Sequence, residues 1–169
     1  MMKQQTLFEV LFEVKLKIYC IDSSSLINLF RHYPRNKCNK FTSLWEELDK
    51  IIENGQIISH ITVFKEISRK DDEIKKWCQN HKSIFKDIDK CQINQLSEIR
   101  EQYSESHWQA GMNREEWADP WIIALAICEN AIIVSDERNS PDRIPYIASR
   151  FGITTLNLID FFRDIGLEL

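Results

Sequence analysis

Five acidic residues occupy positions in the sequence where a carboxylate could do chemistry. Asp22 directly follows the apolar run 17–21, and an Asp-Glu pair follows the apolar run 131–134. Carboxylates and water are the hard oxygen ligands that Mg²⁺ and Mn²⁺ prefer, and these ions commonly act on phosphate esters. The set therefore predicts a metal-dependent phosphodiesterase. Its members are Asp22, Glu66, Asp119, Asp136 and Glu137.

Such a set of carboxylates requires compensation. Two carboxylates about 5 Å apart repel each other by roughly 3 kcal/mol at an effective dielectric constant of 20. Either bound protons or a metal ion must offset that repulsion if the acids converge. A shared divalent cation, Mg²⁺ or Mn²⁺, is the cofactor that we expect.

The elements that must position these acids alternate between strands and helices. Short β-branched or apolar runs predict strands, and apolar residues spaced three or four apart predict helices between them. Buried parallel strands with helical crossovers give an α/β fold with helices on both faces of the sheet. Strands are expected at 17–21, 56–59, 84–88, 131–134 and 153–156, and helices at 23–30, 44–52, 61–67, 119–129 and 158–165, with mostly charged helix across 71–103.

The expected sheet brings the acids to one edge. In open parallel sheets, ligands bind beyond the carboxyl ends of the strands, where Asp22 and the pair Asp136-Glu137 stand. Glu66 and Asp119 lie at or near helix starts next to such strands. Four acidic positions that are distant in sequence could therefore converge.

Each acid also fits a purely structural role. Asp22 suits the cap of the helix that begins in the serines, and Asp119 suits the cap before Pro120. Glu66 fits a solvated helix face, and Asp136 fits a turn. Taken one at a time, these roles explain the acids at least as well as metal binding does.

The arrangement of the acids resembles the PIN-domain family in four places, which together span roughly residues 18–167. The matching pieces are 21–27, 63–67, 118–126 and 133–137, and the first and third are the more specific. The resemblance implies a three-layer α/β/α sandwich with a central parallel sheet and an acidic metal cluster. It also implies endoribonuclease activity on single-stranded RNA, like that of bacterial toxin-antitoxin nucleases.

The fourth piece departs from the family pattern, which commonly has Thr, any residue, then Asp. Here the residues are Ser135-Asp136-Glu137, so Glu137 takes the family's ligand position. Asp136 has the shorter side chain and lies next to the strand end. Both stay as metal ligands, with a narrow preference for Asp136 beside Asp22, Glu66 and Asp119 in the catalytic set.

The RNA substrate must also be bound, and two serines and two arginines are candidates for this role. Ser23 and Ser135 could bind water or a phosphate oxygen, and a turn-capping role fits each equally well. Arg31 and Arg35 belong to the nearest basic cluster, for which a solvated loop is the competing interpretation.

Composition limits how the chain can bind nucleic acid. The formal net charge is -4, so overall charge cannot attract phosphates and any contact must be local. An exposed Trp108 or Trp117 could stack a base, although tryptophans more often anchor a core. The chain has neither a dinucleotide fingerprint nor a phosphate-binding P-loop.

The five cysteines and the hydropathy pattern indicate a compartment. An odd number of cysteines without a Cys-x-x-Cys pair predicts free thiols in a reducing cytosol. No apolar run approaches the roughly 20 residues of a membrane helix. We therefore expect a cytoplasmic protein without membrane contact.

One nuclease domain, residues 17–169, is expected to follow an N-terminal extension, residues 1–16. The extension contains Leu-Phe-Glu-Val twice in succession, at 7–14. An added strand, a contact between two copies in a homodimer and a binding element for an antitoxin protein all stay open for this repeat. The alternative function for the whole chain is a non-catalytic PIN-like RNA-binding or scaffold protein.

Overall fold

The computed structural model describes residues 15–69 and 72–168, and its centre is a five-stranded sheet. All four strand pairings are parallel, and the strand order is β3-β2-β1-β4-β5. The all-parallel sheet confirms the predicted fold class. The strands are β1 (Tyr19–Ile21), β2 (Ile57–His60), β3 (Phe85–Lys86), β4 (Ile132–Val134) and β5 (Thr155–Leu156).

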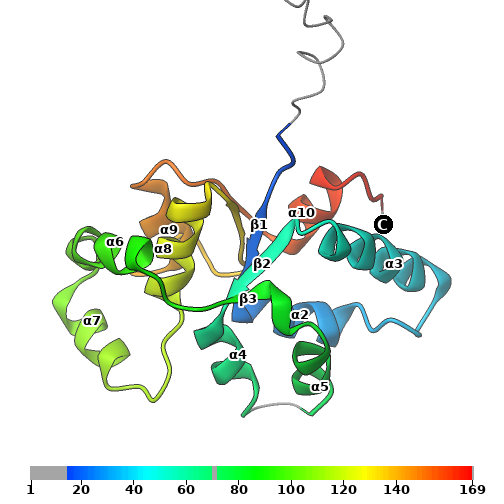
Figure 1. Cartoon of the computed structure of the whole chain (residues 1–169), viewed down its shortest axis with the longest axis horizontal. Helices are drawn as coiled ribbons and strands as arrows, with labels where there is room; N and C mark the ends of the chain where they lie inside the picture. Colours follow the sequence, from blue (N-terminus) through cyan, green and yellow to red (C-terminus); the bar gives the residue numbers. More distant parts are fainter. Residues whose placement is uncertain (1–14, 70–71, 169) are drawn as a thin grey trace, which may run out of the picture.

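Helices cover both faces of the sheet and complete the three layers. Figure 1 shows α6, α8 and α9 on one side and α2, α3 and α10 on the other. This is the three-layer α/β/α arrangement that the resemblance to PIN domains implied. The helices are α2 (Ser23–His32), α3 (Asn39–Glu53), α4 (Ile61–Ile67), α5 (Asp72–Asn80), α6 (Lys90–Glu101), α7 (Glu105–Met112), α8 (Asp119–Glu129), α9 (Ile144–Ser149) and α10 (Leu158–Asp164), with a short 3₁₀ turn at Lys82–Ile84.

Helix α8 is the central helix of the core. Its residues from Ile122 to Ala126 are completely buried, and it contacts β1, β2, β4 and α6. A helix that is apolar all round must be covered on all sides. The helix begins at Asp119 itself, with Ala118 rather than Asp119 as the N-cap, and ends at Asn130 in the left-handed conformation. Asp119 is therefore held in place at the start of a helix whose body is completely buried.

The register of β1 and β4 brings the ends of two strands together. Ile21 pairs with Val134, and the Asp22 amide donates to the Val134 carbonyl at 3.1 Å. The next residues along each strand, Asp22 and Ser135, therefore lie side by side at the carboxyl edge of the sheet. Strand β2 lies on the other side of β1 and leads directly into α4, which carries Glu66.

The predicted elements are all present, and two helices were not predicted. Helix α7 contains Gly111 and lacks a clear apolar stripe, while α9 has only six residues and carries Pro145 near its start. Neither pattern gives a helical signal in sequence. Of the proposed N-terminal extension, residues 1–14 and their Leu-Phe-Glu-Val repeat lie outside the described residues.

The expectation that all five cysteines are free thiols is wrong for two of them. Cys91 on α6 and Cys128 on α8 form a disulfide between residues that are 37 apart in sequence. Only the packing of α6 on α8 brings them together. Cys20 and Cys78 are free and buried, and Cys38 is free and exposed. None of the helices in the described ranges combines the length and apolar character that crossing a bilayer requires.

Candidate active site

Four of the five acids line one hollow, called here the acidic pocket. It has a volume of about 190 Å³ and lies at the carboxyl edge of the sheet. The acids arrive from four elements: the end of β1, helix α4, the start of α8 and the loop after β4. They are Asp22, Glu66, Asp119 and Glu137, and the remaining lining residues are Ser23, Ser24, Ile27, Arg114, Ala118, Ile122, Arg143 and Ile144.

Asp22 is the most buried acid of the pocket, with 3% of its surface exposed. Its carboxylate accepts hydrogen bonds from the Ser25 amide at 2.9 Å, from Ser24 Oγ at 2.9 Å and from Ser135 Oγ at 2.7 Å. The pKa of Asp22 is nevertheless raised to about 7, chiefly by burial and to a smaller extent by the Glu137 charge, against the lowering effect of these hydrogen bonds. Asp22 therefore both caps α2 and presents a poorly compensated carboxylate.

Asp119 shows the same excess of negative charge. Burial raises its pKa to about 7, and the charges of Glu137, Asp22 and Glu66 act in the same direction. The indole N–H of Trp117 has the opposite effect and lowers the pKa. Asp119 therefore lies within the electrostatic influence of the other three acids of the pocket.

Glu66 and Glu137 are held by neighbouring groups. Ser23 Oγ donates to Glu66 Oε2 at 2.7 Å, which joins α2 to α4 across the pocket. Glu137 Oε2 accepts from the Ile144 amide at 2.9 Å, and Glu137 Oε1 lies 3.7 Å from Arg143 Nη1. These contacts fix the two glutamates at the rim.

Asp136 is the predicted acid that the structure does not bring into the pocket. Its Oδ2 accepts from Asn28 Nδ2 at 2.8 Å, and its Oδ1 accepts from the Leu158 amide at 2.9 Å. These bonds tie the end of β4 to α2 and to the start of α10. The geometry thus favours Glu137 over Asp136 as the fourth acid, against the narrow preference drawn from side-chain length, because Asn28 and Leu158 bind the Asp136 carboxylate while Glu137 lines the pocket.

The predicted substrate-binding residues divide into two groups. Ser23 lines the pocket and holds Glu66, whereas Ser135 is buried and holds Asp22. Arg31 and Arg35 do not line the pocket, and Arg35 pairs with Asp49 on α3. The serines therefore position acids, and the basic cluster after α2 lies outside the pocket.

Two pocket residues were missed in the sequence. Ser24 bonds both carboxylate oxygens of Asp22 and accepts from the Asp136 amide at 3.2 Å. The run of three serines after Asp22 was the only available signal for it. Arg114 comes from the loop between α7 and α8 and lies in no recognisable pattern.

The donor set fits a hard divalent cation in chemical type, because four carboxylates offer oxygen ligands and two of them are poorly compensated. As the side chains stand in residues 15–69 and 72–168, no group of three or more His, Cys, Asp or Glu residues is arranged to hold a metal ion. Asp22, Glu66 and Glu137 instead make hydrogen bonds within the protein.

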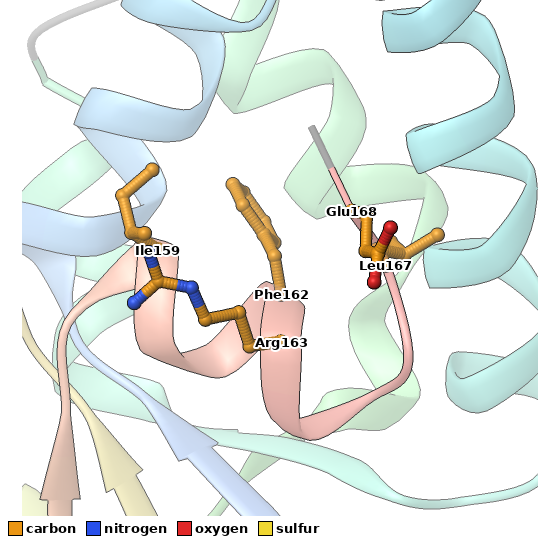
Figure 2. A pocket seen from close by; sticks show the side chains of 5 residues that line it. All are labelled: Ile159, Phe162, Arg163, Leu167 and Glu168. Atoms are coloured by element: carbon orange, nitrogen blue, oxygen red, sulfur yellow. The ribbon is translucent and has the colours of Figure 1, made fainter.

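A larger hollow, of about 410 Å³, lies at α10 and contains none of the four acids. Figure 2 shows Phe162 and Arg163 projecting from α10 beside it. Its other lining residues are Ile159, Leu167 and Glu168. The acidic pocket, at about 190 Å³, is therefore the smaller of the two hollows.

Fold and pocket together define an α/β/α domain with an acidic site at the carboxyl edge of its sheet. By sequence, the chain belongs to the family described as Domain of unknown function (DUF4411), whose model matches residues 19–169. No similar sequence was found among curated proteins.

The solved structures that are similar to the chain include the following two. One is VapBC2 from Rickettsia felis, in a crystal structure bound to a DNA fragment from the VapBC2 promoter. Its sequence is 17% identical, the TM-score is 0.49, and the match covers 83% of this chain and 98% of that chain. The other is FitAcB from Neisseria gonorrhoeae, with 12% identity, a TM-score of 0.49 and coverage of 83% and 97%. Similarity at this level does not assign an activity.

Proposed function

We propose that the protein is a divalent-metal-dependent endoribonuclease that cleaves single-stranded RNA in the acidic pocket. One observation carries the proposal: four acids from distant parts of the chain line one hollow, and two have pKa values raised to about 7. A pocket with four carboxylates and only two guanidinium groups in its lining keeps unfavourable electrostatic energy, which a bound divalent cation would relieve.

Asp22, Glu66, Asp119 and Glu137 are the residues that would hold Mg²⁺ or Mn²⁺. Such an ion supplies Lewis-acid polarisation of a phosphate and a water of lowered pKa. Around it, Ser24 and Ser135 orient Asp22. The guanidinium groups of Arg114 and Arg143 are the cations that line the pocket, and guanidinium geometry matches phosphate oxygens.

The decisive test is cleavage of fluorescently labelled single-stranded RNA by the purified protein, with Mn²⁺ and with a chelator. We expect cleavage only with metal, and a loss of at least about 100-fold in rate for Asp22→Asn and for Asp119→Asn, because electrostatic stabilisation of this kind contributes several kcal/mol. Both substitutions remove a charge at nearly constant volume.

Asp164→Asn is the matched control. It makes the same chemical change at the other end of β1, where Asp164 bonds Tyr19 and Lys17. Wild-type cleavage by Asp164→Asn is expected. If Asp119→Asn folds with a cooperative melting transition and cuts at the wild-type rate, the acidic pocket is not the active site. RNA that binds but stays intact under every metal condition would favour the non-catalytic RNA-binding alternative.

The role of an RNA-cleaving toxin with an antitoxin partner is a narrower part of the proposal. Its support is the resemblance of the four acidic motifs to PIN-domain nucleases. Co-expression with the product of the neighbouring reading frame tests it: a stable complex whose formation suppresses cleavage would support the toxin role. Unchanged cleavage in the presence of that product would leave a nuclease without this partner.

A further inference from the structure

A second hollow, called here the tryptophan cleft, adjoins the acidic pocket. Its volume is about 300 Å³, at the lower end of the roughly 300–1,000 Å³ typical of small-molecule sites. Three tryptophans from α7, α8 and the loop between them line it, together with Met112 and Pro120. The lining also includes Thr62, Leu96, Gly111, Arg114, Glu115 and Glu116.

The cleft and the acidic pocket share a wall. Arg114 lines both hollows. The start of α8 separates them: Asp119 faces the acidic pocket, while Trp117, Pro120 and Trp121 line the cleft. A ligand group in the cleft is therefore a near neighbour of a group held by the acids.

The aromatic rings of the cleft are fixed before any ligand binds. Trp121 stacks on the buried His60 with the ring centroids 5.4 Å apart and the planes at 5°. Trp108 packs edge-on against Trp117, with centroids 5.1 Å apart. Gly111 allows this packing, because a side chain there would meet the Trp117 ring at 2.3 Å. Rings held in this way lose little conformational entropy when they bind a flat ligand.

The charges around the cleft also suit part of a nucleotide. The acids at the rim, Glu115 and Glu116, both pair with Arg69. Arg114 makes no ion pair with any residue that the structure describes, so its charge is available at the junction of the two hollows. An apolar aromatic slot beside a cation fits a base and its phosphate.

We propose that the tryptophan cleft binds one unpaired base of single-stranded RNA, next to the phosphate that lies in the acidic pocket. This inference rests on the proposed function, because the phosphate places the base. A base in a duplex is already stacked on its neighbours and cannot enter the cleft, so the cleft would give the site its preference for unpaired RNA.

Binding, not cleavage, provides the test. The Asp119→Asn protein, which is expected to cleave at least about 100-fold more slowly, is titrated in Mn²⁺ against labelled single-stranded RNA and followed by fluorescence anisotropy. Trp108→Leu should weaken binding about tenfold, as expected for the loss of one stacked base. Trp77→Leu is the control, because Trp77 is also half-buried among other aromatic rings but lies outside the cleft.

A second pair of variants avoids the core. Met112 is 61% exposed in the cleft, and Ile93 is 55% exposed on α6, outside it. Met112→Asp should weaken RNA binding several-fold, and Ile93→Asp should not, although both add the same charge. Equal effects of the two substitutions would overturn the proposal, since long-range repulsion alone would explain them.

Abasic RNAs locate the base. Removing the base at one position should lower the affinity of the wild-type cleft for RNA about tenfold. The same abasic RNA should bind Trp108→Leu as tightly as the intact RNA does, because the stacking contact is already lost. A full abasic penalty in Trp108→Leu would overturn the assignment, as would RNA binding that ignores Trp108 and Met112 or no RNA binding at all. If the wild type cleaves RNA but binding does not depend on the tryptophans, the nuclease function stands and the base site is wrong. If binding depends on the tryptophans but no RNA is cleaved, the base site stands and the nuclease function is wrong.

Discussion

The two ends of strand β1 place the same kind of side chain in opposite environments. At the start of the strand, Asp164 from α10 accepts from Tyr19 Oη at 2.7 Å and from Lys17 Nζ at 2.9 Å, and these hydrogen bonds lower its pKa. At the end, burial raises the pKa of Asp22 to about 7. The first acid is compensated by its partners and contributes to the fold, whereas the second has no cationic partner among the described residues and is a metal ligand in the proposed function.

The largest effect is expected at the acidic pocket: removing one of its negative charges should make the folded protein more stable. A carboxyl whose folded pKa lies above its unfolded value binds its proton more tightly in the folded state, so its contribution to stability falls as pH rises from about 4 to 7. Asp119→Asn should therefore raise the free energy of unfolding by roughly 2–4 kcal/mol at pH 8 in chelator, and by little at pH 4. Urea denaturation at the two pH values measures it.

A bound metal ion should reverse the order of stability of the wild type and Asp119→Asn. A cation that binds only the folded state stabilises it by mass action. Millimolar Mn²⁺ is expected to raise the melting temperature of the wild type clearly and that of Asp119→Asn much less. Equal shifts in both proteins would mean that the metal binds elsewhere. A destabilised Asp119→Asn at pH 8 would mean that the pocket charge is already compensated.

The adjacent residues Asp136 and Glu137 provide the second test, of intermediate size. Glu137→Gln should raise the Mn²⁺ concentration needed for half-maximal cleavage several-fold, because it removes a carboxylate that lines the pocket. Asp136→Asn should leave that concentration unchanged and lower the free energy of unfolding by about 1–2 kcal/mol, through loss of a charged acceptor for Asn28 or Leu158.

Metal titrations and urea denaturation of both variants separate the two roles. A raised metal requirement in Asp136→Asn alone would restore Asp136 as the ligand. If neither variant changes the requirement, three carboxylates suffice and Glu137 only positions Ile144 and Arg143 at the rim.

The smallest effect is expected at the compensated end of β1. Asp164 has a lowered pKa, so its contribution to stability is present above its unfolded pKa of roughly 3.9 and is lost as pH falls through the folded value. Because the Lys17–Asp164 pair is partly exposed, Asp164→Asn should lower the free energy of unfolding by at most about 1 kcal/mol at pH 8. The difference should shrink as pH falls through the lowered pKa of Asp164. A gain in stability at pH 8 would erase the contrast between the two ends.

The sequence determined the alternation of strands and helices, because β-branched runs and apolar spacing are local signals. It also placed Asp22 after a strand and Asp119 at the start of a buried helix, since the neighbouring residues fix those positions. The parallel sheet followed from this pattern, because strands joined by helical crossovers pair in one direction.

Tertiary structure decided which side chains meet. Whether Asp136 or Glu137 faces the acids depends on the turn after β4 and on Asn28 and Leu158, which capture Asp136 from other elements. Arg114 reaches the pocket only through the path of the loop after α7, and Cys91 meets Cys128 only because α6 packs on α8. The raised pKa values of Asp22 and Asp119 likewise could not be predicted from the sequence, because a pKa depends on burial and on neighbours that are distant in sequence.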